Sequence, residues 1–158
     1  MAAKTKVAAE RAERVLVLQR VFEAPRELLF KVWTEPQHLV HWLCPRGFTL
    51  THCEGVLRPG GAWKSCMRSP QGQDLWLGGV YREIVPPEKL VFTHAWTDAA
   101  GKPGHETLVT VTFAERNGKT EMTFRQATFT SVEDRDGHRG GWTECFDKLA
   151  EYVAKRVG

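Results

Sequence analysis

HRGGWTECFDKLAEYV, residues 138–153, is the stretch that decides the fold. Apolar side chains recur in it at helical spacing and form one stripe: Trp142, Phe146, Leu149 and Val153. A capping-box pattern at Ser131 lies just upstream, so the sequence predicts a helix from about residue 131 to about residue 155. An aromatic stripe on so long a helix indicates that one face of the helix covers another layer of the protein.

Gly140 and Gly141 lie inside this predicted helix, although glycine costs a helix interior about 1 kcal/mol relative to alanine. One hypothesis is that the helix is kinked or interrupted there. This point would then be the mouth of a cavity, with Trp142 as its first covering side chain. The alternative is close packing, in which a strand or a bulky ring approaches the two glycines. Alanine substitutions separate the two hypotheses, because only close packing makes added methyl groups destabilising.

Residues upstream of the long helix predict a sheet with two short helices. A strand over residues 14–23 is followed by a helix over 26–33, with Pro25 in its first turn, and then by a second helix that Thr34 caps. Six more strands are expected at residues 48–57, 62–69, 75–85, 89–97, 105–115 and 120–129. Short turns join most of them, so the sheet is expected to be antiparallel. The predicted fold class is α+β: a curved sheet of about seven strands around the C-terminal helix.

Composition narrows the class of protein. The chain has 158 residues, and we expect a flexible tail over 1–13 and a single domain over 14–158. A net charge of +3 without a basic stripe argues against a nucleic-acid partner. The apolar run VLVL is too short to cross a membrane. Four cysteines without a CxxC pair or a secretory signal predict free thiols and a cytoplasmic location.

Neither a cofactor nor a metal ion is expected from the sequence. A zinc site would need three or four ligands at recognisable spacing. His38 and His41 share one face of the second short helix, but no third ligand is evident. The motifs of serine hydrolases, zinc proteases and nucleotide-binding loops are also missing.

The order of elements and several motifs resemble a known family. The matching stretches are VFEAPRELLFKVWTEPQHLVHWL (21–43), LRPGGAW (57–63), GGVYREIVPPEKLVFT (78–93) and GGWTECFDKLAEYV (140–153). They are similar to the activator of heat-shock-protein-90 ATPase homologues, a branch of the START/SRPBCC superfamily with the helix-grip fold. The resemblance implies a cavity between sheet and helix that is often open to a hydrophobic ligand, and it implies no shared catalytic residues. The eukaryotic co-chaperone has a further N-terminal domain where this sequence has only a short tail.

The side chains expected to line such a cavity are mostly aromatic: Trp42, Trp76, Tyr81, Phe92, His94, Trp96, Phe113, Phe124, Gln126, Trp142 and Phe146. Alternation places His94 in one row with Leu90, Phe92 and Trp96. His94 is either a ligand-binding group or base, or a core histidine satisfied by a neighbour. Gln126 lies on an apolar face, so it needs a partner in protein, water or ligand.

The inward face of residues 80–85 is left open by the sequence. Gly78–Gly79 predicts a bulge or a sharp bend that shifts the register. If Tyr81 and Glu83 both point inward with His94, the cavity holds the groups that a lyase or cyclase needs. A surface Glu83 paired with a basic residue is the alternative.

Three functions follow from this reasoning. The favoured one is binding of a small hydrophobic molecule, with a homodimer as a possible assembly. The second is a cavity enzyme of the cyclase/aromatase or lyase type, and the third is a cofactor of a chaperone ATPase. Convergence of His94, Glu83 and Tyr81 would favour the enzyme, whereas a cavity with only His94 and Gln126 as polar groups would favour binding.

Overall fold

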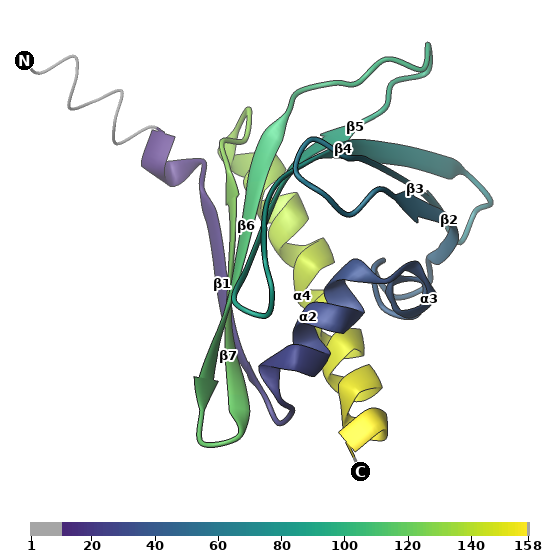
Figure 1. Cartoon of the computed structure of the whole chain (residues 1–158). Helices are drawn as coiled ribbons and strands as arrows, with labels where there is room; N and C mark the ends of the chain where they lie inside the picture. The colour runs from purple at the N-terminus through teal and green to yellow at the C-terminus, as the bar shows by residue number, and fades with distance from the viewer. Residues whose placement is uncertain (1–10, 158) are drawn as a thin grey trace, which may run out of the picture.

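Within residues 11–157, which the computed structural model describes, seven strands form one antiparallel sheet in the order β1-β7-β6-β5-β4-β3-β2. The strands are β1 (Leu16–Phe22), β2 (Thr49–Gly55), β3 (Ala62–Arg68), β4 (Asp74–Val85), β5 (Lys89–Trp96), β6 (Thr107–Arg116) and β7 (Lys119–Ala127). The helices are α2 (Arg26–Thr34), α3 (Pro36–Leu39) and α4 (Val132–Val157), and they lie inside the curve of the sheet (Figure 1). The predicted fold class is confirmed. Most of the predicted tail over residues 1–13 lies outside the described residues, and residues 11–13 are helical.

The core lies between α4 and the centre of the sheet. Strands β6 and β7 alternate, so their inward side chains form two matching buried rows: Val109, Val111 and Phe113 against Met122, Phe124 and Gln126. The stripe of α4 packs on these rows, with the Phe124 ring 4.6 Å from that of Trp142 and 5.3 Å from that of Phe146. The predicted stripe therefore faces the sheet, as its spacing required.

Helix α4 is continuous from residue 132 to residue 157. The Asp134 backbone N–H donates to Ser131 Oγ at 3.0 Å, which confirms the predicted cap. The predicted interruption at the glycine pair is wrong. Close packing is not found either: a Cβ built on Gly140 has nothing within 4 Å, and one on Gly141 meets Pro45 Cγ at an ordinary 3.7 Å. Gly140 therefore faces open space, and Gly141 has room for a methyl group beside Pro45.

Strand β4 has its irregularity at a different place from the predicted one. The pairing with β5 keeps one register past Gly78 and shifts between Tyr81 and Glu83. Gly79 is required by close approach, because a Cβ there would lie 1.9 Å from the Thr93 carbonyl oxygen of β5. The bulge gives β4 one extra residue, so Tyr81 is buried while Glu83 is exposed.

The short helices fill the open end of the curve. Helix α2 buries one apolar face, and the Phe30 ring meets that of Phe113 edge-on at 6.0 Å. The N-cap of α3 is Glu35 rather than the predicted Thr34. Thr34 Oγ1 instead donates back to the Phe30 carbonyl at 2.9 Å, which occupies its hydroxyl within α2.

Candidate functional site

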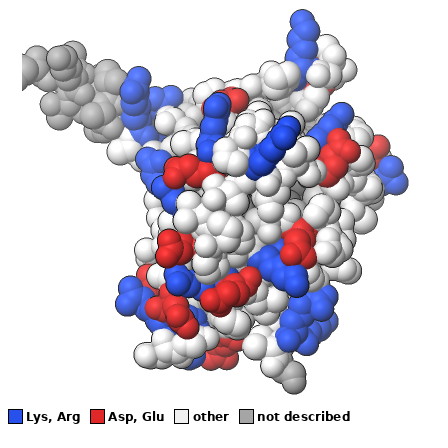
Figure 2. Space-filling view, in the orientation of Figure 1, with Lys and Arg blue, Asp and Glu red and all other residues white. Residues whose placement is uncertain are grey.

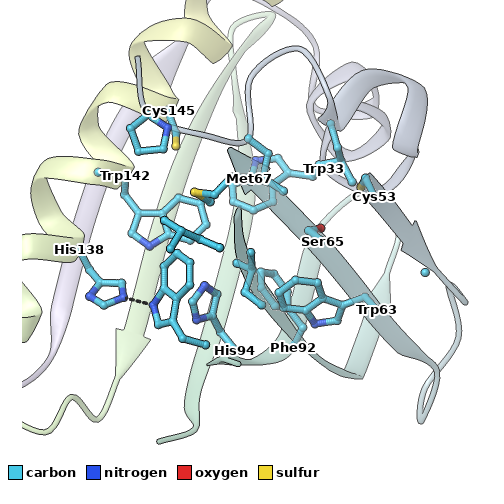
Figure 3. Close-up of a pocket in the computed structure, with 18 of the residues that line it drawn as sticks. Trp33, Cys53, Trp63, Ser65, Met67, Phe92, His94, His138, Trp142 and Cys145 are labelled. Atoms are coloured by element: carbon cyan, nitrogen blue, oxygen red, sulfur yellow. Dashed lines mark hydrogen bonds between the residues drawn. The ribbon is translucent and has the colours of Figure 1, made fainter. Parts of the chain in front are cut away.

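A cavity of about 420 Å³ lies between strands β2–β5, helices α2 and α3, and the N-terminal half of α4. Its walls are mainly aromatic and aliphatic, as Figure 3 shows. Strand β5 contributes the predicted inward row Leu90, Phe92, His94 and Trp96. The other walls include Trp33 from α2, Trp63 and Met67 from β3, and Trp142 and Cys145 from α4. Sheet and helices thus border one mainly apolar space that holds a few polar groups and is partly open to the surface.

The structure brings some of the sequence-derived candidates together at this cavity: Tyr81, Phe92, His94, Trp96 and Trp142. Other candidates lie in the packed core beside it and do not line it: Trp42, Phe113, Phe124, Gln126 and Phe146. These side chains point inward as expected. They are covered because α2 and α4 pack directly on β6 and β7, so the space left open lies only toward β2–β5.

Trp76 lies on the opposite face of the sheet from the cavity. Its neighbour Leu77 takes the inward position on β4, and alternation turns Trp76 outward. The Lys64 ammonium sits 4.8 Å from its ring centroid, and the His52 ring lies 5.5 Å away. The assignment of Trp76 to the cavity is therefore corrected: it belongs to an outer cluster.

His94 is the central polar group of the cavity. It is 4% exposed, and apart from a bond to its own backbone its ring makes no hydrogen bond to the residues that the structure describes. Burial lowers its pKa to about 3, and the neighbouring His138 adds to this effect. The imidazole is therefore neutral near pH 7. The sequence left open a core histidine satisfied by a neighbour, and the structure shows a ring that faces the cavity and bonds to no neighbouring side chain among residues 11–157 (Figure 3).

His138 is a cavity residue that the sequence reasoning missed. Its Nε2 accepts a hydrogen bond from Trp96 Nε1 at 3.0 Å, the bond that is dashed in Figure 3. Its Nδ1 lies 2.8 Å from the Asp134 carbonyl oxygen, so the neutral ring carries its proton on Nδ1. The signal was available, because His138 lies four residues before Trp142 and so extends the α4 stripe by one turn.

Buried hydrogen bonds fix the cavity wall made by Trp142. Its Nε1 donates to Gln126 Oε1 at 2.8 Å, and Gln126 Nε2 lies 2.8 Å from Thr107 Oγ1. Thr107 Oγ1 in turn donates to the His94 carbonyl at 3.2 Å. The partner that Gln126 needed is therefore protein, and the chain of bonds ties α4 to β5, β6 and β7.

Comparison with known proteins identifies the family of this chain. A sequence profile described as Activator of Hsp90 ATPase homolog 1-like protein matches residues 23–154. The chain belongs to this family. A comparison of the sequence with curated proteins found no match.

Solved structures of other proteins in bacteria share the fold. The AHSA1 protein from Silicibacter pomeroyi is 28% identical with a TM-score of 0.82, over 90% of this chain and 99% of its own. A protein from Chromobacterium violaceum is also 28% identical, with a TM-score of 0.79 over 89% and 96% of the two chains. A Nitrosomonas europaea protein, 23% identical over 92% and 97%, has a TM-score of 0.79 and shows the shared fold alone.

The three side chains whose convergence would favour an enzyme, His94, Glu83 and Tyr81, do not converge. Glu83 is on the outside, where its carboxylate lies 3.3 Å from Lys89 Nζ. Tyr81 does line the cavity, and burial raises its pKa to about 12. Near pH 7 Tyr81 and His94 are therefore both neutral, and Glu83 lies outside the cavity. The carboxylates in the lining are instead Glu54, Glu133 and Asp134.

The two histidines considered as metal ligands, His38 and His41, both contact Tyr152. His38 Nδ1 lies 2.6 Å from the Tyr152 hydroxyl, and the His41 ring stacks on the Tyr152 ring at 5.2 Å. Among residues 11–157 no three His, Cys, Asp or Glu side chains come together as metal ligands. Over the same range no helix is both long and apolar enough to cross a membrane.

Proposed function

We propose that this protein binds a small hydrophobic molecule in the cavity between its sheet and α4. The observation that carries the proposal is the aromatic-walled space of about 420 Å³ with His94 turned into it. Known small-molecule sites are concave and mostly apolar, hold a few placed polar groups, and measure about 300–1,000 Å³. Membership of a family whose fold has such a cavity supports the same function.

The interior of a domain is otherwise close-packed, so a space of this size needs a physical reason. Side chains that border a void lose dispersion contacts on one side. An apolar ligand would restore those contacts and remove its own surface from water, at about 25 cal/mol per Å² of apolar area. Binding of an apolar ligand in the cavity therefore stabilises the complex of protein and ligand.

The two alternatives have less support. The enzyme considered from the sequence would use Glu83 together with His94 and Tyr81, and the β4 bulge turns Glu83 outward. The family description names activation of the Hsp90 ATPase, which would act through a surface. On the face seen in Figure 2, basic and acidic side chains are interspersed without a patch of one sign. A homodimer and a cytoplasmic location stay predictions.

A matched pair of variants tests the proposal. Gly141 borders the cavity, whereas Gly140 is exposed and does not border it. Methionine at either position raises helix propensity by a similar amount, but only Gly141→Met places a side chain at the cavity lining, beside Pro45. Titration with prodan, an uncharged naphthalene dye that brightens in apolar sites, reports occupancy.

We expect saturable binding of one dye by the unmodified protein. Gly140→Met should bind it with unchanged affinity, and Gly141→Met should bind it about tenfold more weakly or worse, since overpacking typically costs 1–3 kcal/mol. Equal binding by both variants would place the dye outside the cavity. The absence of saturable binding by the unmodified protein would contradict the proposed function.

A further inference from the structure

Resting on the proposed function, we infer that the cavity selects uncharged ligands against anions, and that His94 contacts a polar group of the ligand. A single apolar ring system carrying one hydroxyl or carbonyl group fits this description. A fatty acid or an aromatic carboxylate does not. The inference follows from the charges along the lining and from the environment of His94.

The charged residues that line the cavity are all acidic. They are Glu54, Glu133 and Asp134, and the lining within residues 11–157 includes no lysine or arginine. The Glu54 carboxylate lies 3.3 Å from His52 Nε2, and Asp134 Oδ1 lies 3.4 Å from His138 Nδ1. An entering anion would therefore meet negative charge and find no cation to pair with.

Basic side chains near the cavity are directed elsewhere. Arg46 pairs with Glu151 at 2.7 Å on the surface. Lys148 Nζ donates to the Cys44 carbonyl at 2.9 Å, and Lys64 lies over the outer face of Trp76. None of these three cations lines the cavity.

The N-terminus of α4 borders the cavity, and a helix N-terminus by itself favours an anion. Here the first turn already carries Glu133 and Asp134. The Asp134 N–H is also taken by Ser131 Oγ. The partial positive charge at this end of the helix is therefore already balanced by the carboxylates of Glu133 and Asp134.

His94 offers a hydrogen bond without a charge. Its ring is nine-tenths buried or more and bonds to no other described residue, only to its own backbone. It borders the cavity between Trp63 and Trp96, with ring centroids 5.9 and 5.6 Å away. Burial and the neighbouring His138 keep its pKa far below neutrality. A neutral imidazole has one donor and one acceptor nitrogen, so it suits a hydroxyl or a carbonyl. It cannot neutralise a carboxylate, whose desolvation would then be uncompensated.

Three probes of one ring size test the inference: 2-naphthalenemethanol, 2-naphthoate and 2-methylnaphthalene. Their affinities can be measured near neutral pH from shifts of the tryptophan indole N–H signals in ¹H–¹⁵N spectra. We expect the alcohol to bind about threefold to tenfold more tightly than the hydrocarbon, the range of a net neutral hydrogen bond. The carboxylate should bind at least about tenfold more weakly than the alcohol.

Two variants of His94 assign the polar contact. His94→Phe should bring the affinity for the alcohol down to that for the hydrocarbon, while the hydrocarbon binds as before. His94→Gln, which keeps a neutral hydrogen-bonding group, should retain part of the preference for the alcohol. If His94→Phe does not fold, the hydrocarbon loses its site too, and the test then relies on the Gln variant and the unmodified protein.

The outcomes separate the inference from the proposed function. Naphthoate bound as tightly as the alcohol would overturn the inference and leave the binding function standing. An alcohol preference that survives in His94→Phe would overturn the role of His94. Failure of all three probes to bind would overturn the proposed function and the inference together.

Discussion

Replacement of Gln126 by leucine tests how the cavity wall is held. Gln126 is fully buried, and its side-chain oxygen accepts the hydrogen bond that the Trp142 indole N–H donates, at 2.8 Å. Leucine has a similar size, so the substitution leaves little void. It removes the acceptor for Trp142 and the contact with Thr107 at 2.8 Å.

The expected loss follows from these two contacts. A buried donor left without a partner costs about 1–3 kcal/mol, and loss of the Thr107 contact adds about 0.5–1.5 kcal/mol. Gln126→Leu should therefore lower the free energy of unfolding by about 1.5–4.5 kcal/mol. In a Trp142→Phe background the indole donor is gone, so the same substitution should cost about 1–3 kcal/mol less.

Urea denaturation followed by circular dichroism measures these losses without relying on tryptophan emission. Gln19→Leu is the control, because Gln19 is exposed on β1 and its amide is 3.5 Å from Thr123 Oγ1. That change should alter stability by less than about 0.5 kcal/mol. If Gln126→Leu costs no more than this control, or if no coupling to Trp142→Phe is found, the buried chain of bonds does not anchor the wall.

Three more predictions concern stability. Phe146→Ala and Leu149→Ala should each cost about 2–5 kcal/mol in urea denaturation because both are buried on the α4 stripe, and unchanged midpoints would show that this face is not packed. Gly140→Ala should raise the free energy of unfolding by up to about 1 kcal/mol, since no atom lies within 4 Å of the added Cβ; a lower midpoint would reveal a contact there. The pKa of His94 is about 3 in the folded chain, so the unfolded chain binds more protons at intermediate pH and stability falls as pH drops below about 6.5. Between about pH 7 and pH 5 this amounts to about 2 kcal/mol, which His94→Gln should abolish; an unchanged pH dependence in that variant would argue against a buried neutral His94.

The packing of helix and sheet was predictable from the sequence wherever apolar residues recur with one clear period. The stripe from Trp142 to Val153 and the alternation of the strands determine which faces are buried, so the element order and the α4–sheet packing followed from the sequence. The row containing Phe92, His94 and Trp96 was also placed on the correct face. The family resemblance supplied the helix-grip arrangement, and the matched profile over residues 23–154 confirms it.

The position of the bulge in β4 was harder to predict from the sequence. The sequence pointed to Gly78–Gly79 as the bulge, but these glycines are there for close strand approach, and the bulge lies three residues further along at Arg82. Nothing in the composition of that segment distinguishes the two possibilities. The orientation of Glu83 depended on this one residue, because a register shift of one moves a side chain to the other face.

Which inward side chains border open space could not be read from periodicity. Phe124 and Phe92 both point inward, yet Phe124 is covered by α4 while Phe92 borders the cavity. The difference depends on where the helices pack on the sheet, and hydrophobic patterns along one chain do not encode that distance. Trp76 was misplaced for another reason: its ring packs with Lys64 and His52 on the outer face of the sheet, an environment that suits a half-buried aromatic side chain.

A crystal structure of the protein with 2-naphthalenemethanol tests the central claim most directly. The account predicts one ligand between the sheet and α4, with its rings against Trp142 and Phe92 and its hydroxyl within hydrogen-bonding distance of a His94 ring nitrogen. The account would be contradicted if, at a saturating concentration, the ligand were found only on the surface and rearranged side chains filled this cavity.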